Sequence, residues 1–162
     1  MSILFKKYEE SDFNNFVKCM EGLQDYIIGL DSLRILRKSE NYGKAYTQNI
    51  IKKISKHEGI IILAYEQKKI VGCISGIIEK QTKDDLLECI PMKDGRVLEL
   101  FVSNEIRNKG IGKKLMKKVE DYFKRKKCDA IRIEVFEPNL LARKFYEKIG
   151  YAERIIDLIK KL

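Results

Sequence analysis

A six-residue turn between an apolar run and a basic run, Arg107–Gly112, constrains the fold of this chain more than any other segment. The residues before it, Val97–Val102, are mostly apolar and β-forming, which predicts a buried strand. The residues after it place five apolar side chains on one helical stripe, namely Ile111, Leu115, Val119, Tyr122 and Phe123. The sequence therefore predicts a strand, a tight turn and an amphipathic helix in direct succession.

The turn has the chemistry of a phosphate-binding loop. Gly110 and Gly112 lack a Cβ, so the backbone can approach a ligand closely. A helix that starts here presents unpaired N–H groups and a partial positive charge, which favour phosphate, and Arg107 and Lys109 add charge at the rim. Neither the Walker A loop nor the dinucleotide fingerprint fits, because no hydroxyl follows Gly112 and Leu115 occupies the position of a third glycine.

Length and composition predict one globular domain over residues 1–162. The chain is 44% hydrophobic and 35% charged, which is typical of a soluble protein that buries a single core. It has no secretory leader and no apolar run of about 18 residues, so we expect a cytoplasmic protein that does not cross a membrane.

The cysteines and the histidine predict no metal site and no disulfide framework. Cys19, Cys73, Cys89 and Cys128 are widely spaced, and His57 is the single histidine. Zinc and redox motifs need closely spaced pairs of such residues. We expect reduced, structural cysteines.

The excess positive charge is concentrated around the predicted loop and helix. The segment from Arg107 to Lys127 carries ten basic residues against two acidic ones, while the whole chain has a net charge of +9. A polyphosphate ligand would be attracted to this segment. An RNA-associated module is the alternative, but no interleaved aromatic pattern or RNA-binding motif supports it, so nucleic acid is not expected as a partner.

The predicted elements alternate between strands and helices. Strands are expected over Ile3–Tyr8, Ile60–Tyr65, Lys69–Glu79, Val97–Val102 and Ala130–Val135. Helices are expected from Phe13 to Met20, over Asn41–Lys56, after Gly112, and from Asn139 to Ile149. The region after Met20 and up to Leu36 is predicted to be a helix broken by Gly22 and Gly29. The region from Lys80 to Gly95 is predicted to be a long loop. Tyr151–Leu162 fits either a final strand or a short helix. This order predicts a mixed sheet with helices on both faces.

A second motif lies beyond the Ala130–Val135 strand. It reads N-x-x-A-x-x-F-Y-x-x-x-G-Y, from Asn139 to Tyr151. Together with R-x-x-G-x-G at Arg107–Gly112, it resembles the GNAT acetyltransferase superfamily. The resemblance covers about Val97 to Tyr151, and earlier residues match only in the order of elements. It implies an α/β (α+β) fold, with a central mixed, mostly antiparallel twisted sheet that is flanked by helices and splayed at an acetyl-CoA site.

The resemblance also implies the residues that bind acetyl-CoA, with no metal. The strand backbone would pair with the pantetheine arm, the turn would hold the pyrophosphate, and Asn139 would contact the cofactor unless it is only a helix cap. These positions are Phe101, Val102, Ser103, Arg107, Asn108, Lys109, Gly110, Ile111, Gly112, Asn139 and Tyr146.

Two residues are candidates for proton transfer. Tyr146 resembles the family's general acid, which would protonate the departing thiolate, although plain aromatic packing is the alternative. Glu99 is the single charge in its strand and would serve as the general base, unless it belongs to a structural ion pair or a water chain replaces it.

The resemblance implies an acetyl-CoA-dependent N-acetyltransferase that acts on a small-molecule or protein amine through a ternary complex. Scattered carboxylates in the acceptor region would attract a cationic amine, but lysines lie between them. A non-catalytic acyl-CoA-binding regulator is the alternative function. Dimers are common in the family, so a homodimer is also an option.

Overall fold

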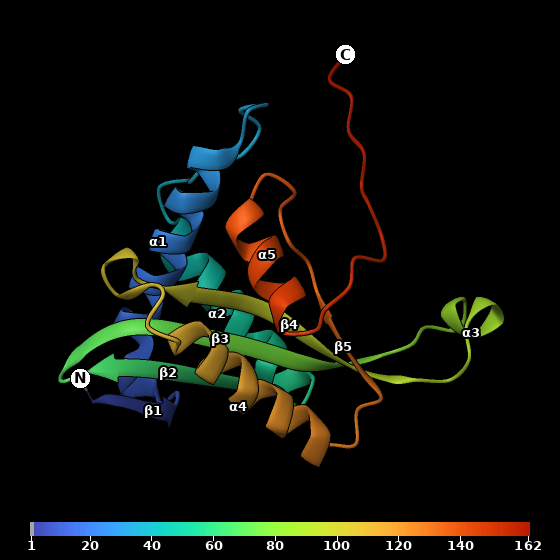
Figure 1. Ribbon diagram of the computed structural model, residues 1–162, viewed down its shortest axis with the longest axis horizontal. Helices are drawn as coiled ribbons and strands as arrows, with labels where there is room; N and C mark the ends of the chain where they lie inside the picture. Colours follow the sequence, from blue (N-terminus) through green and yellow to red (C-terminus); the bar gives the residue numbers. More distant parts are fainter. Residues whose placement is uncertain (1) are drawn as a thin grey trace.

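The computed structural model describes residues 2–162, which form a five-stranded mixed sheet with the order β1-β2-β3-β4-β5 (Figure 1). The strands are β1 (Ile3–Lys7), β2 (Ile60–Glu66), β3 (Lys69–Lys80), β4 (Lys93–Val102) and β5 (Ala130–Ile133). The first four strands pair antiparallel, and β5 pairs parallel with β4.

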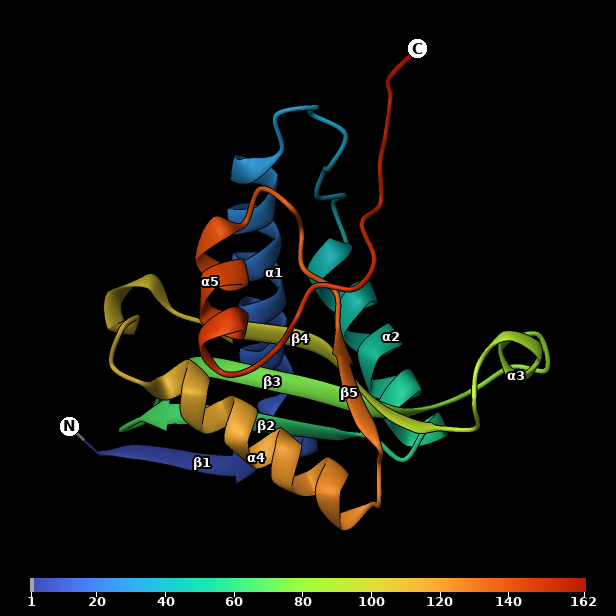
Figure 2. The same cartoon turned by 45° about the vertical axis from the view of Figure 1, so that its right-hand side comes forward.

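Helices cover both faces of this sheet (Figures 1 and 2). The helices are α1 (Phe13–Leu30), α2 (Tyr42–Lys56), α3 (Asp85–Glu88), α4 (Ile111–Arg125) and α5 (Leu140–Lys148), with short 3-10 turns at Glu10–Asp12 and Asn104–Ile106. The helices α1 and α2 pack on one face, and α4 packs on the other. This arrangement confirms the predicted fold class.

Each face has its own core, built from the residue periodicity of its elements. On one face the apolar stripe of α4 packs on the sheet, and its Leu115, Val119 and Phe123 are fully buried. On the other face Phe16 and Met20 of α1 pack with Leu63 of β2. We name these two sides the α4 face and the α1–α2 face.

The sheet opens between β4 and β5. Their pairing runs from Asp94 to Val97 on β4 and ends where Val97 lies opposite Ile133. Strand β4 then continues to Val102 without β5, and α5 lies beside this opening (Figure 2). The opening is the splay that the family resemblance implied.

A β-bulge lies at the start of this opening. Glu99 is opposite Ser75 and Val97 is opposite Gly76, so Leu98 is an extra residue in β4. The bulge shifts the alternation of side chains. Val97 and Leu100 contact the core on the α4 face, whereas Leu98 and Phe101 contact the core on the α1–α2 face.

The first helix differs from its prediction. Gly22 and Gly29 do not break it, and α1 continues to Leu30. A Cβ on Gly22 would lie 3.1 Å from the Phe101 ring, so this glycine provides close packing between α1 and β4. The glycine reflects tertiary packing rather than a break in the helix.

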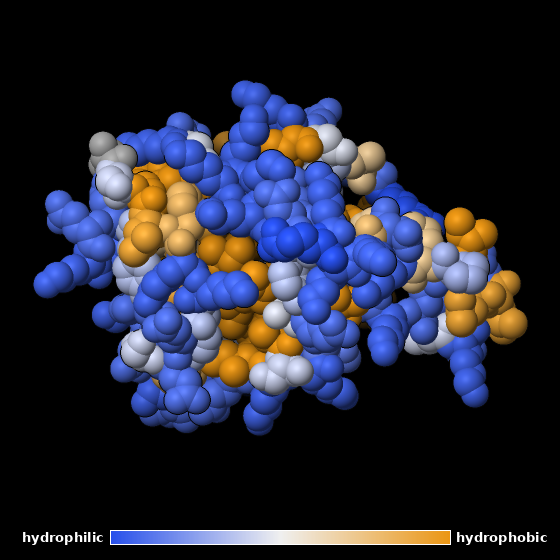
Figure 3. Space-filling model, turned by 90° about the horizontal axis from the view of Figure 1, so that it is seen from below, coloured by the Kyte–Doolittle hydropathy of each residue, from blue (hydrophilic) through white to orange (hydrophobic). Residues whose placement is uncertain are grey.

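The segment Lys80–Gly95 also differs from the predicted loop. Strand β3 extends to Lys80, β4 begins at Lys93, and α3 lies between them at a projecting end of the molecule. Figure 3 shows apolar side chains gathered on this end, where the exposed ones are Leu86, Leu87 and Ile90.

The C-terminal segment after Tyr151 is neither a strand nor a helix. It runs away from the body of the protein in both ribbon views, with Ile155 and Leu158 79% and 88% exposed. Between residues 2 and 162, no helix combines the length and the apolar composition that crossing a membrane requires.

Candidate active site

The free end of β4 presents its backbone to the opening at Val102. The Ser103 N–H donates to the Val71 carbonyl, and the Phe101 carbonyl lies against Gly72, so both residues turn these groups toward β3. Because backbone groups alternate along a strand, the Val102 N–H points the other way, toward the place that β5 has left. Of the three predicted residues Phe101, Val102 and Ser103, Val102 is therefore placed to pair with an extended ligand.

The N-terminus of α4 lies next to this strand end. Gly110 is the N-cap residue with a φ of +77°, and Asn108 also has a positive φ of +64°. Within residues 2–162 no side chain caps the helix, so its first N–H groups are available to an anion. A Cβ on Gly112 would face Phe145 at 3.5 Å and Val102 at 3.8 Å. The backbone of Gly110, Ile111 and Gly112 thus fits the predicted pyrophosphate cradle.

Arg107 is placed differently from the other residues of the turn. Its guanidinium lies over the Tyr26 ring at 4.4 Å, and its Nε donates to the Val102 carbonyl at 3.1 Å. Arg107 therefore ties α1 to the end of β4. Asn108 and Lys109 are exposed beside it.

Asn139 caps α5. Its Oδ1 accepts hydrogen bonds from the Ala142 N–H at 3.2 Å and from the Tyr26 hydroxyl at 3.5 Å. The helix-cap role considered from the sequence is thus present. The contact with Tyr26 also joins α5 to α1 across the mouth of the opening.

Glu99 lies on the α1–α2 face, against α2. The Tyr46 hydroxyl donates a hydrogen bond to its carboxylate, and Tyr46 stacks on Tyr42 with ring centroids 5.0 Å apart. Burial raises the pKa of Glu99, while the bond from Tyr46 and the charge of Lys53 oppose this shift. A carboxylate with a raised pKa is a better proton acceptor than an exposed one.

Unsatisfied hydroxyls lie on the elements that surround Glu99. Ser75 is its direct cross-strand neighbour, and Thr47 follows Tyr46 on α2. Both side chains are fully buried, and neither hydroxyl has a hydrogen-bond partner within residues 2–162. Buried polar groups of this kind are usually satisfied by water or by a ligand.

Tyr146 of α5 lies within electrostatic range of Glu99. Its pKa is raised, mainly by burial and further by the charge of Glu99, so the phenol stays protonated at neutral pH. No residue between 2 and 162 forms a hydrogen bond with its hydroxyl. Its ring packs edge-on against Phe145 and Tyr151, at 5.2 and 5.9 Å between centroids. The packing orients the ring and leaves the O–H able to donate.

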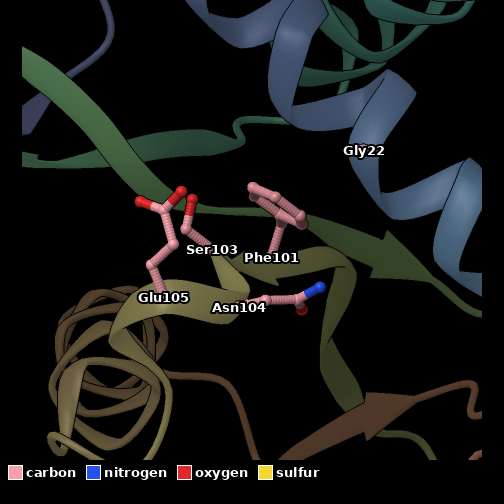
Figure 4. A pocket seen from close by; sticks show the side chains of 5 residues that line it. All are labelled: Gly22, Phe101, Ser103, Asn104 and Glu105. Carbon is pink, nitrogen blue, oxygen red and sulfur yellow. The ribbon is translucent and has the colours of Figure 1, made fainter.

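A cavity of about 250 Å³ adjoins the end of β4, between this strand and α1. It is lined by Gly22, Phe101, Ser103, Asn104 and Glu105. Figure 4 shows the Phe101 ring directed toward the helix that carries Gly22, while Ser103 and Glu105 point together and Asn104 points away from them. Two of the predicted strand residues therefore border an accessible space.

Two residues of the site, Tyr46 and Tyr26, were not predicted from the sequence. Tyr46 is 53 residues from Glu99 in the chain, so no local pattern connects them. The i, i+4 spacing of Tyr42 and Tyr46 was the available signal, since it places both rings on one face of a helix. Within residues 2–162 no cluster of three metal-ligating side chains occurs.

Comparison with known proteins agrees with this geometry. The sequence profile of the Acetyltransferase (GNAT) family matches residues 28–151. An uncharacterised N-acetyltransferase of Methanocaldococcus jannaschii is 42% identical over 62 residues, which are 38% of this chain and 40% of that relative's length.

Solved structures share the fold at low sequence identity. The tetramutant of the BH1408 protein from Bacillus halodurans has a TM-score of 0.85 and 16% identity, with 98% of this chain and 99% of that chain covered. A predicted acetyltransferase from Clostridium acetobutylicum, solved with acetyl-CoA, has a TM-score of 0.75 and 15% identity, with 99% and 96% covered.

The profile match, the sheet opening and the two sequence motifs point to the same conclusion. The match runs from the end of α1 through α5 and includes the opening, the α4 N-terminus and the α5 cap. The chain belongs to the GNAT acetyltransferase family.

Proposed function

We propose that this protein transfers an acetyl group from acetyl-CoA directly to a primary amine. One observation carries the proposal. Glu99 and Tyr146 lie within electrostatic range of each other, on two different elements that border the opening toward which the Val102 N–H points. A proton acceptor, a proton donor and a carbonyl-polarising N–H are the three groups that aminolysis of a thioester requires.

Acetyl-CoA supplies the thioester, and the residues of the chain perform the proton transfers. Glu99 accepts the proton of the substrate ammonium, directly or through a water held by the Ser75 hydroxyl. The Val102 N–H polarises the thioester carbonyl as the amine nitrogen bonds to its carbon. The C–S bond then breaks, and Tyr146 gives its proton to the thiolate. The nitrogen still carries two protons at this point, and it loses one of them, directly or through water, to restore the Tyr146 phenol and leave the neutral amide. The α4 N-terminus holds the pyrophosphate.

The acceptor is a small-molecule or protein amine that enters on the α1–α2 face, where Glu99 lies. The solved Clostridium acetobutylicum structure with acetyl-CoA supports the choice of cosubstrate through its shared fold. The exposed start of α4 and the raised pKa of Glu99 support the roles given to these elements.

Calorimetric titration of acetyl-CoA tests the proposal, with wild type and Gly112→Trp in parallel. An indole at this position would fill the cradle between Phe145 and Val102, so we expect binding to wild type and none to the variant. Lys124→Trp, on the exposed side of the same helix, is the matched control and should bind as wild type does. Thermal unfolding would establish that all three proteins are folded.

A panel of primary amines then tests for transfer through CoA release. Absence of acetyl-CoA binding by folded wild type would contradict the whole proposal. Binding without release with any amine would favour the non-catalytic regulator instead.

A further inference from the structure

A second cavity, of about 530 Å³, lies on the α1–α2 face at the end of the sheet away from Val102. It is bordered by the last turns of α2 and by the paired parts of β3 and β4. The lining residues that matter for its chemistry are Lys53, His57, Glu79, Lys80, Arg96 and Leu98.

The lining carries more positive than negative charge, with Lys53, Lys80 and Arg96 against Glu79. Arg96 is held by two carboxylates, with its Nη1 3.3 Å from Glu79 and its Nη2 bonded to Glu134. The ammonium groups of Lys53 and Lys80 have no ion-pair partner within residues 2–162. Since Glu79 is the one carboxylate in the lining and already pairs with Arg96, the cavity favours an anion.

The cavity begins next to the candidate base. Leu98 is the bulged residue directly before Glu99, and Lys53 lies close enough to Glu99 to lower its pKa against the larger effect of burial. Going back from its C-terminal end, β4 thus carries Val102, then Glu99, and then the residues Leu98 and Arg96 that line the basic cavity. With about 3.3 Å per residue, the distance from Glu99 to the positions of Leu98 and Arg96 is roughly 3 to 10 Å.

Three of the carboxylates that could attract a cationic acceptor are already engaged. Asp31 accepts the backbone N–H groups of Ile35 and Leu36, and Asp25 pairs with Lys38 at 2.5 Å. Asp85 accepts hydrogen bonds from Thr82. These three carboxylates are therefore not free to bind a polyamine.

We propose that the basic cavity binds an anionic group of the acceptor, so that the substrate is a primary amine with a carboxylate or phosphate a few bonds from its nitrogen. This inference rests on the proposed function, because it assumes that the amine is placed at Glu99. Lys53 and Lys80 are the residues that select the anion. A short spacer between amine and anion matches the distance from Glu99 to the cavity.

Matched pairs of acceptors test this inference through CoA release. One pair is 4-aminobutanoate and 4-aminobutanamide, which differ only in a carboxylate against an amide. The other pair is O-phosphoethanolamine and ethanolamine, which tests phosphate. We expect kcat/KM to be about tenfold or more higher for the anionic member of at least one pair, as a charged hydrogen bond provides, and the pair that responds distinguishes carboxylate from phosphate.

The variants Lys53→Gln and Lys80→Gln should reduce this preference to within about threefold, mainly through KM, as loss of a binding contact does. Lys52→Gln and Lys83→Gln remove exposed charges that lie outside the cavity lining, and should keep the preference. Calorimetric titration of the anionic compounds, with wild type and the four variants, measures the same selection without turnover.

Equal kcat/KM for both members of both pairs would overturn the inference while leaving N-acetyltransfer intact. A preference for the anionic member that persists in both the Lys53→Gln and the Lys80→Gln variant would also overturn the inference. If no amine is acetylated, the proposed function fails, and the titrations still decide on the cavity. Binding that is lost in the two lining variants would support it, and absence of binding would overturn it.

Discussion

The hydroxyl of Tyr46 on α2 donates a hydrogen bond to the carboxylate of Glu99 on β4. In the chain, β2, β3 and α3 lie between this helix and this strand. This bond stabilises the charged form of Glu99, whereas burial destabilises it. The hydrogen bond from Tyr46 and the burial of Glu99 therefore act in opposite directions on the pKa of the candidate base.

Replacing Tyr46 with Phe should move the acidic limb of the rate profile to higher pH. Activity requires deprotonated Glu99, and loss of the hydrogen bond leaves burial less opposed, so the pKa of Glu99 rises further. The measurement is kcat/KM against pH. Tyr42→Phe is the control, because the Tyr42 hydroxyl bonds to Gln24 at 3.2 Å instead, and an equal shift in both variants would contradict the assignment.

Replacing Tyr146 with Phe should lower kcat by about a hundredfold or more and leave acetyl-CoA affinity nearly unchanged, since general acids contribute about that factor. Steady-state CoA release and calorimetry measure the two effects. Tyr8→Phe, remote from the opening, should match wild type. Unchanged kcat in Tyr146→Phe would assign this ring to packing alone.

Asp12 is predicted to stabilise the fold in a pH-dependent way. It is only 4% exposed, and although burial favours its neutral form, hydrogen bonds from Tyr65, Lys6 and the Glu9 N–H lower its pKa below the ordinary 3.8. A lowered folded-state pKa gives stabilisation that is present above the unfolded-state value and is lost as pH falls through the folded-state value.

Asp12→Asn should therefore reduce the free energy of unfolding by about 1–3 kcal/mol near neutral pH. Urea denaturation at neutral pH and at about pH 2.5 measures it, and the difference from wild type should narrow in acid. Asp84→Asn, on an exposed turn, is the control. A loss of equal size at both pH values would rule out the charge of Asp12 as the cause.

Two glycines should respond to alanine with opposite signs. A Cβ on Gly95 would lie 2.5 Å from the Phe123 ring, whose side chain is fully buried, so Gly95→Ala should cost about 1–3 kcal/mol of unfolding free energy. A Cβ on Gly29 in α1 would meet nothing within 4 Å, so Gly29→Ala should stabilise by up to about 1 kcal/mol. Denaturant titration of both variants measures these effects, and destabilisation by Gly29→Ala would contradict the open environment of this position.

The local sequence pattern was sufficient to predict the strands and helices around the two motifs. The strand before Arg107, the helix after Gly112 and the helix capped by Asn139 all lie where periodicity and capping chemistry predicted them. Each of these signals is contained within about one element of sequence, which is why it could be recognised without the fold.

Features that depend on distant contacts could not be predicted in this way. Gly22 reads as a helix breaker until the Phe101 ring is placed against it, and Tyr46 reads as a surface tyrosine until β4 passes beside α2. The segment after Tyr151 has apolar residues that fit either periodicity, and no neighbouring surface in the described fold selects between them.

Beyond the bulge at Leu98, the length of β4 is more important than the identity of its residues. If Leu98 itself were deleted, Val97 and Glu99 would become neighbours in a regular alternation, and both would keep their sides of the sheet. A deletion between Glu99 and Val102 would instead turn either the carboxylate or the strand end to the opposite side of the sheet, whereas conservative substitutions there leave the alternation intact. Evolution of this region should therefore proceed by substitution, with insertions and deletions displaced to the α3 segment, where the strand pairing has already ended.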